Sequence, residues 1–297
     1  MIKVLHSKQF NILFFACVFS FLFFIFDFCQ AAVLYLSPST GSYYQGDTFM
    51  VEIRLDTQGE YINAVEANLN FSPDILEVKD LSQGNSILTL WVKEPGFSEN
   101  KISILGGVPG GYQGADGLLG KIIFQVSESG QGSARINFQD DSKVLLNDGK
   151  GTEAKLTIQG AKFNIIPEKS EIPGNKWKEE LEKDKIPPQP FKIEISQNSA
   201  IFEGKYFITF STTDKETGVD YYEVKEGKGD WEKAVSPYIL KNQRLTDDIW
   251  IKAIDKAGNE WVEIVKAARK PIWEYVLYGV LFLILLSGII ILVRKIL

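Results

Sequence analysis

Hydrophobic and polar residues alternate with a period of two through most of residues 33–166. Successive side chains of a β-strand point to opposite faces, so this alternation predicts strands with one apolar and one polar face. Turns such as residues 39–41 and 106–117 separate the runs. We therefore predict a two-sheet antiparallel sandwich here. Its predicted inward residues are Phe49, Val51, Ile53 and Leu55; Val65, Ala67, Leu69 and Phe71; Ile122, Phe124 and Val126; Ala134, Ile136 and Phe138; and Ala161, Phe163 and Ile165.

Residues 191–268 show the same alternation in shorter runs, for example Tyr206, Ile208 and Phe210. About seven short strands in such a length are typical of an immunoglobulin-like sandwich, here without its disulfide. Gly258-Asn259 predicts a tight hairpin turn in which both residues have positive φ. The fold class is therefore all-β, with two antiparallel β-sandwich domains.

Residues 167–190 contain five prolines and many charged residues, so they cannot form a core and are predicted to be a linker. Residues 176–185 favour a short helix of about two turns. Two interpretations remain open for this segment. It is a semi-rigid spacer, or its Trp177 docks on a neighbouring domain.

Two apolar segments at the ends of the chain predict membrane targeting. Residues 1–32 begin with Lys3 and Lys8, continue through an apolar stretch and end in small residues, which is typical of a signal peptide. The alternative is an uncleaved first membrane helix, which leaves the following chain on the same outer side. Residues 272–293 form a 22-residue run in which Glu274 is the only charged member, and this length predicts a transmembrane helix. Residues 294–297 then form a minute cytoplasmic tail.

Composition restricts the chemistry of the part between these segments. The two cysteines and the single histidine all lie within residues 1–32. Without them, residues 33–297 can form no Ser-His-Asp triad, Cys-His pair or histidine-ligated metal centre. The net charge of −6 also argues against a nucleic-acid partner, which requires clustered basic residues. A glycosidase needs only two carboxylates, but no pair lies in a recognisable motif, so we predict that the protein is not an enzyme.

Several motifs within residues 33–166 resemble the cohesin module of cell-surface and cellulosome scaffolding proteins. They are Gly46-Asp47-Thr48, at the start of the first long strand, and the segments 62–78, 117–124 and 147–152. The resemblance implies binding rather than catalysis, because cohesins hold a calcium-loaded dockerin on one sheet face. It also implies a link to polysaccharide-degrading assemblies. Residues 191–268 resemble a bacterial surface Ig-like or fibronectin-like repeat, through motifs around Asp214, Gly218 and Asp255.

Two sets of residues are candidates for a binding face. Glu66, Asn68 and Asn70 point away from the core of their predicted strand and can form a polar recognition face. The alternative is an ordinary solvated face. Trp91 is a candidate aromatic platform for a sugar or a protein, or else a core residue.

An oxygen-rich stretch provides the candidate metal ligands. Asp140, Asp141, Asp148 and Glu153 can supply carboxylate oxygens to Ca²⁺. Their spacing does not match an EF-hand loop, and Asx-Gly runs are ordinary turn chemistry, so the turn interpretation stays open. No other cofactor is predicted.

These features predict a single-pass, surface-displayed scaffold protein, with most of the chain outside the cell and the C-terminus in the cytoplasm. The cohesin-like module would bind an extracellular, dockerin-type protein. One alternative is a surface adhesin that binds carbohydrate, for which exposed coplanar aromatic residues would lie on one sheet face. A flat polar face would favour protein binding. A second alternative is a structural component of a surface layer.

Overall fold

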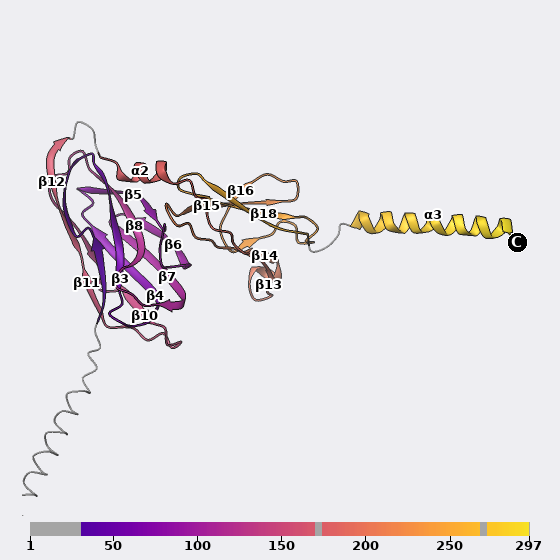
Figure 1. Cartoon of the computed structure of the whole chain (residues 1–297), viewed down its shortest axis with the longest axis horizontal. Helices are drawn as coiled ribbons and strands as arrows, with labels where there is room; N and C mark the ends of the chain where they lie inside the picture. Colours follow the sequence, from indigo (N-terminus) through magenta and orange to yellow (C-terminus); the bar gives the residue numbers. More distant parts are fainter. Residues whose placement is uncertain (1–30, 170–173, 268–271, 297) are drawn as a thin grey trace, which may run out of the picture.

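The computed structural model describes the backbone of residues 31–169, 174–267 and 272–296. The side chains of Lys169, of residues 272–274, of 288 and of 290–296 are also outside the description. The predicted signal peptide therefore lies, except for its last two residues, outside the described part, as does a piece of the predicted linker. Figure 1 shows two β-rich domains arranged in sequence order, with a long helix beyond the second.

Residues 32–169 form a sandwich of two sheets. The first sheet has the order β11-β1-β3-β8-β5, and the second has the order β2-β12-β9-β4-β7-β6, with β10 paired to β4. The strands of the first sheet are β1 (Ala32–Ser37), β3 (Thr48–Asp56), β5 (Leu76–Ser82), β8 (Gly117–Val126) and β11 (Leu156–Gln159). Those of the second are β2 (Thr40–Gln45), β4 (Ile62–Phe71), β6 (Leu90–Ser98), β7 (Lys101–Tyr112), β9 (Gly132–Phe138), β10 (Lys143–Leu146) and β12 (Ala161–Lys169).

The core of this sandwich consists of the residues that the alternation predicts. All of the inward positions named above are buried. Aromatic rings fill one end of the core: the ring centroids of Tyr43 and Phe49 are 3.9 Å apart, and those of Phe49 and Phe163 are 5.2 Å apart. Burial of such side chains provides the main free energy that holds the two sheets together.

The prediction of purely antiparallel sheets is wrong at one side of the sandwich. β1 pairs with β11, and β2 pairs with β12, in parallel. The chain passes from one sheet to the other between β1 and β2, and does so again in the same direction between β11 and β12. Parallel neighbours need a long connection, and here almost the whole domain provides it.

Residues 194–265 form two smaller sheets, with the orders β13-β14-β17 and β16-β15-β18-β19. A short apolar core lies between them and includes Ile208, Phe210 and Ile251. In the β18–β19 hairpin only Gly258 has a positive φ, of 86°, so the prediction of positive φ at Asn259 is wrong. The strands are β13 (Glu194–Gln197), β14 (Tyr206–Thr209), β15 (Val219–Glu226), β16 (Glu232–Ala234), β17 (Tyr238–Ile239), β18 (Ile249–Asp255) and β19 (Glu260–Val265), with a 3₁₀ turn, η1, at Phe202–Gly204.

The segment between the domains is packed against them. Helix α2 covers Lys176–Lys183, and its N-terminus is capped by Asn175, whose Oδ1 accepts a hydrogen bond from the Lys178 amide at 2.9 Å. Trp177 is only 7% exposed. Lys121 of β8 forms a 2.9 Å ion pair with Glu180. The structure therefore agrees with the interpretation in which Trp177 docks on a neighbouring domain.

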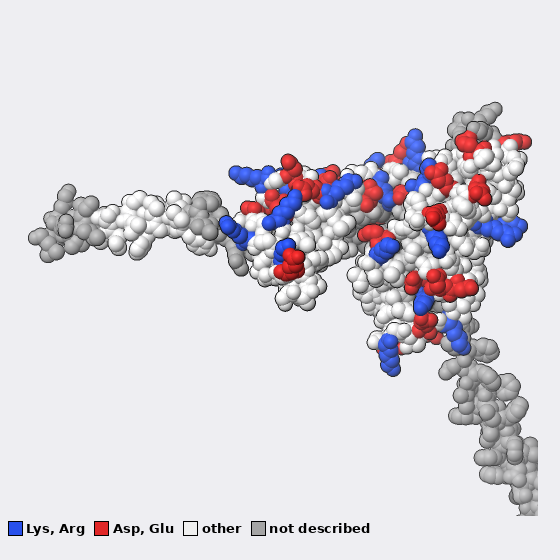
Figure 2. Space-filling model, turned by 180° about the vertical axis from the view of Figure 1, so that it is seen from behind, with Lys and Arg blue, Asp and Glu red and all other residues white. Residues whose placement is uncertain are grey.

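Helix α3 covers Ile272–Ile296 and extends from the second domain away from the first (Figure 1). Its described side chains are uncharged and largely exposed, whereas acidic and basic side chains are interspersed over both domains (Figure 2). Within residues 31–169, 174–267 and 272–296, as far as their side chains are described, no helix has both the length and the apolar character needed to cross a membrane. The predicted membrane span at residues 272–293 includes side chains that lie outside the description, those of residues 272–274, 288 and 290–293.

Candidate binding face and domain junction

The three predicted recognition residues lie side by side on the outer face of β4. Glu66, Asn68 and Asn70 are half-buried, because strands pair with β4 on both sides. Asn68 Nδ2 lies 3.3 Å from Glu66 Oε1, and Ser103 Oγ donates a 2.9 Å hydrogen bond to Asn68 Oδ1. These bonds orient the amide of Asn68, so the row is a preformed polar surface.

Strand register extends this surface across the sheet. Paired residues of neighbouring strands share a face, so Lys101 and Asn137 flank Asn70, while Leu105 and Lys143 flank Glu66. We call the outer surface of β9, β4, β7 and β6 the polar face. Along β6 a shallow hollow of about 220 Å³ adjoins it, lined by Lys93, Glu94, Gly96, Phe97, Ser98, Lys101, Ser103 and Leu105.

Trp91 does not belong to the polar face. It pairs with Gly106, which lies in the buried row of β7, and its half-buried side chain packs against the core. Its remaining surface lines the cleft between the two domains. The structure thus favours the core alternative for Trp91, with one edge available in that cleft.

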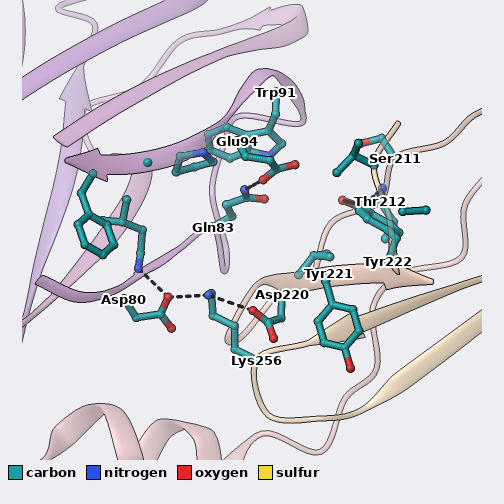
Figure 3. A pocket seen from close by; sticks show the side chains of 17 residues that line it. Asp80, Gln83, Trp91, Glu94, Ser211, Thr212, Asp220, Tyr221, Tyr222 and Lys256 are labelled. Carbon is teal, nitrogen blue, oxygen red and sulfur yellow. Dashed lines mark hydrogen bonds and ion pairs between the residues drawn. The ribbon is translucent and has the colours of Figure 1, made fainter. Parts of the chain in front are cut away.

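The cleft between the domains is a cavity of about 420 Å³ (Figure 3). Lys256 bridges it, with Nζ 2.7 Å from Asp80 of the first domain and 3.7 Å from Asp220 of the second. A neighbouring hollow of about 600 Å³ shares Trp91 and Tyr222 with it. Burial raises the pKa of Tyr222 above its usual value of 10.0, so the phenol stays neutral here.

The four predicted calcium ligands are exposed and do not form a cluster among the described residues. Two of them, Asp148 and Glu153, already take part in local contacts. Asp148 accepts hydrogen bonds from the Lys150 amide at 2.8 Å and from Thr152 Oγ1 at 2.5 Å, which is ordinary turn chemistry. These bonds hold the pKa of Asp148 below 3.8. Glu153 forms an ion pair with Lys143 at 3.2 Å. Asp140 and Asp141 are exposed at the turn before β10.

A different set of carboxylates is brought together by the fold. Asp184, Asp214 and Asp255 are all buried, and each offers an oxygen within 4.8 Å of the others. Among the residues described, this is the one group of three or more potential metal ligands that lie so close, and it contains none of the predicted four. The sequence contains only a weak local indication of this cluster. Asp214 lies four residues before Gly218 and Asp255 lies four residues before Asn259, and in each case the backbone amide of the later residue donates a hydrogen bond to the carboxylate.

Comparison with known proteins identifies the first sandwich. Residues 36–161 match the family model of the cohesin domain, which is less than half of the chain. The chain therefore contains a cohesin domain, as the motifs predicted. No curated protein matches the chain at a significant level.

Several solved cohesin structures are similar to this domain. A non-cellulosomal cohesin from the archaeon Archaeoglobus fulgidus is 21% identical, with 46% of this chain and 92% of that chain covered and a TM-score of 0.39. The sixth cohesin of scaffoldin B from Acetivibrio cellulolyticus, solved with a Cel5 dockerin, is 17% identical, with 46% and 100% covered and a TM-score of 0.38. The cohesin CaCohA2 of Clostridium acetobutylicum is 17% identical, with 47% and 94% covered and a TM-score of 0.37.

Proposed function

We propose that this chain is a surface-displayed binding protein whose cohesin domain holds a dockerin-type protein on the polar face. The match of residues 36–161 to the cohesin domain carries this proposal. Cohesin domains are non-catalytic scaffold modules, and some of the similar structures were solved with bound dockerins.

The chemistry of the polar face suits a protein partner. Amides, hydroxyls and both signs of charge occur along β4, β7 and β9, so the face can form many directed hydrogen bonds. Apolar side chains adjoin it: Leu90 of β6 is 55% exposed, and Leu105 lies in the outer row of β7. A polar area next to apolar anchors is the usual composition of a specific protein interface.

Carbohydrate binding is less well supported by this face. Sugar-binding platforms stack on exposed aromatic rings, but the outer rows that β4, β7 and β9 contribute contain none. Phe97 of β6 is 50% exposed and stands alone at the edge. A flat polar surface of this kind favours a protein.

The proposal includes display on a membrane. Its support is the sequence: a basic, apolar N-terminal segment and the 22-residue apolar run at residues 272–293. The second sandwich, proposed here to be Ig-like, would be the spacer between the anchor and the cohesin domain. Fractionation of the producing cells, with protease treatment of intact cells, would test this part: expected is a membrane-bound chain whose two domains are cleaved from outside.

The binding function is tested with the full chain immobilised and exposed to a panel of dockerin domains, including those encoded in the same genome, and to a glycan array. We expect one or more dockerins to be retained. Simultaneous Glu66→Ala, Asn68→Ala and Asn70→Ala should weaken that binding at least about 10-fold, because these residues form the centre of the face.

The matched control changes an exposed ion pair on the opposite sheet, Glu77→Ala with Lys79→Ala, and should leave affinity unchanged. Equal loss in both variants would reject the polar face as the site. Retention of glycans alone would support the adhesin alternative. Retention of neither class would reject both binding functions and leave the structural one.

A further inference from the structure

Three carboxylates meet where the inter-domain segment joins the second domain, and each comes from a different stretch of chain. Asp184 follows the last residue of α2, Asp214 lies in the loop between β14 and β15, and Asp255 ends β18. Their exposed fractions are 1%, 3% and 1%. Because they are 30 to 71 residues apart along the chain, only the tertiary fold places them within 4.8 Å of one another.

Hydrogen bonds fix the orientation of each carboxylate but leave one oxygen without a partner. Asp184 accepts from the Ile186 amide at 2.9 Å and from Thr217 Oγ1 at 2.5 Å. Asp255 accepts from the amide and the side chain of Asn259, both at 2.8 Å.

Asp214 uses only its Oδ1, which accepts from the amides of Glu216 and Gly218 at 3.0 and 2.8 Å. Its Oδ2 is buried and has no hydrogen-bond partner. Burying an ionised oxygen without a partner costs several kcal/mol, so this oxygen needs a proton or a cation.

Two lysines near the cluster, Lys121 and Lys256, are engaged elsewhere. Lys121 pairs with Glu180, and Lys256 pairs with Asp80 and Asp220. No ion pair among the described residues includes Asp184, Asp214 or Asp255.

The cluster is therefore an uncompensated concentration of negative charge. Burial, with the charges of Asp184 and Asp214, raises the pKa of Asp255, although the bonds from Asn259 oppose this. Partial loss of hydration, with the neighbouring Asp184 and Asp214, also raises the pKa of Glu216, an exposed carboxyl that faces the cluster. Lys121 acts in the opposite direction on Glu216.

We propose that Asp184, Asp214 and Asp255 bind one Ca²⁺ ion that fastens the end of the inter-domain segment to the second domain. Carboxylates are hard oxygen ligands, which suit Ca²⁺ or Mg²⁺ rather than softer metals. Oxygens that share a Ca²⁺ at about 2.4 Å lie within about 5 Å of each other, as these do. Asp214 Oδ2 gains its missing partner, and the divalent charge offsets the three carboxylates. Ca²⁺ is favoured over Mg²⁺ because it accepts an irregular arrangement of oxygen ligands, whereas Mg²⁺ requires near-ideal octahedral geometry and keeps several of its waters.

The ion would also stabilise the junction between the two domains. The loop that carries Asp214 touches the first domain directly: the carbonyl of Asp214 accepts a 3.3 Å bond from the Asn85 amide, and that of Thr217 accepts a 2.6 Å bond from Ser82 Oγ. Thr217 in turn donates to Asp184. Ordering the cluster therefore orders the segments that hold the cohesin domain in place on the second domain.

The test is a thermal melt of the full chain in EDTA, in Ca²⁺ and in Mg²⁺, together with Tb³⁺ luminescence as a direct probe of the site. We expect Ca²⁺ at about 100 times its dissociation constant to raise the melting temperature of the second domain by about 10–20 °C. Mg²⁺ should give a smaller rise. Asp214→Asn should abolish the Ca²⁺ shift, yet melt higher than the wild type in EDTA, because it removes one buried charge.

Two control variants separate this site from other acidic groups. Asp220→Asn, beside Lys256 in the cleft, and Asp148→Asn, in the exposed turn, should keep the full Ca²⁺ shift. A Ca²⁺ shift that persists in Asp214→Asn would place the ion elsewhere and overturn the proposal. Identical melts of the wild type in EDTA and Ca²⁺ would overturn it too, and this measurement does not depend on the folding of any variant.

Discussion

The two sandwiches are held together by different kinds of interior. The first buries a continuous apolar cluster of 29 residues, whereas the corresponding cluster of the second contains seven, so the second has much less hydrophobic stabilisation. Buried polar residues are more numerous in the second domain and the segment leading to it than in the first domain. The first domain buries Thr57, Ser82 and Ser142, and all three buried aspartates lie in the second domain or the segment leading to it.

This difference means that the domains should respond to different perturbations. Hydrophobic burial involves neither a bound ion nor a proton, so low concentrations of Ca²⁺ and moderate changes of pH alter it little, whereas buried carboxylates are sensitive to both. The cohesin domain is therefore expected to be a constant platform for its polar face. The junction behind it is the part whose stability depends on solution conditions.

The largest expected effect comes from the core of the first domain. Phe49→Ala removes a ring that contacts Tyr43, Phe124 and Phe163 and should lower the free energy of unfolding by about 3–5 kcal/mol. Chemical denaturation should show the same loss in EDTA and in Ca²⁺. Phe97→Ala, at a site that is 50% exposed, is the control and should cost less than about 0.5 kcal/mol. If the loss of unfolding free energy differed between EDTA and Ca²⁺, the stability of the first domain would also depend on the ion, and the proposed difference between the two domains would be wrong.

The next effect concerns the contact between the domains. A Cβ at Gly84 would overlap the carbonyl oxygen of Glu216 and lie 2.7 Å from its carbonyl carbon, so Gly84→Ala should separate the domains at this point. Overpacking of this kind costs about 1–3 kcal/mol. Small-angle scattering should show a longer or more variable particle, and limited proteolysis should cut the segment around α2 faster.

Gly174→Ala is the matched control for Gly84→Ala. Its Cβ would come no closer than 3.9 Å to Asp47, so the scattering profile should equal that of the wild type. Unchanged proteolysis of Gly84→Ala would show that the domains are not held by this contact.

A smaller effect is expected from pH. In chelator, Asp255 has a folded pKa raised above 3.8 by burial and by Asp184 and Asp214, so the folded state binds its proton more tightly than the unfolded state does. The stability of the second domain should then rise as the pH falls through the folded pKa towards 3.8. In Ca²⁺ the trend should reverse, because the ion requires ionised ligands. Melts of Asp255→Asn should lack the difference between the two series.

The smallest effect is expected from surface charge. Lys79 and Glu77 form an exposed pair at 3.1 Å on the outer side of β5. Lys79→Ala should change the free energy of unfolding by less than about 0.5 kcal/mol, and less still in high salt. A larger loss, measured by denaturation, would show that electrostatics contribute to the first domain as they do to the junction.

The sequence predicted most of the first domain because its signal is local. Alternation named the buried residues of β3, β4, β8, β9 and β12, and the outward row Glu66, Asn68 and Asn70 follows from the same period. The parallel pairing of β1 with β11 was missed, because alternation specifies which face a residue occupies and not which strand lies beside it.

The candidate metal site could not be predicted in the same way. Asp140, Asp141, Asp148 and Glu153 attracted the prediction because they are close in sequence, yet the structure leaves them exposed. Asp184, Asp214 and Asp255 were divided among a linker and two unrelated turns. Nothing in a local pattern distinguishes a carboxylate that caps a turn from one that a distant segment will bury.

The sequence by itself determined the strands, their apolar faces and the cohesin motifs, because each depends on residues a few positions apart. The tertiary structure alone decided three things: the direction of the edge strands, the docking of α2 on the first domain, and the meeting of three aspartates at the junction. Each of these depends on segments that are distant along the chain. Their contacts are made by packing, which restricts backbone directions and burial only after the sheets have formed.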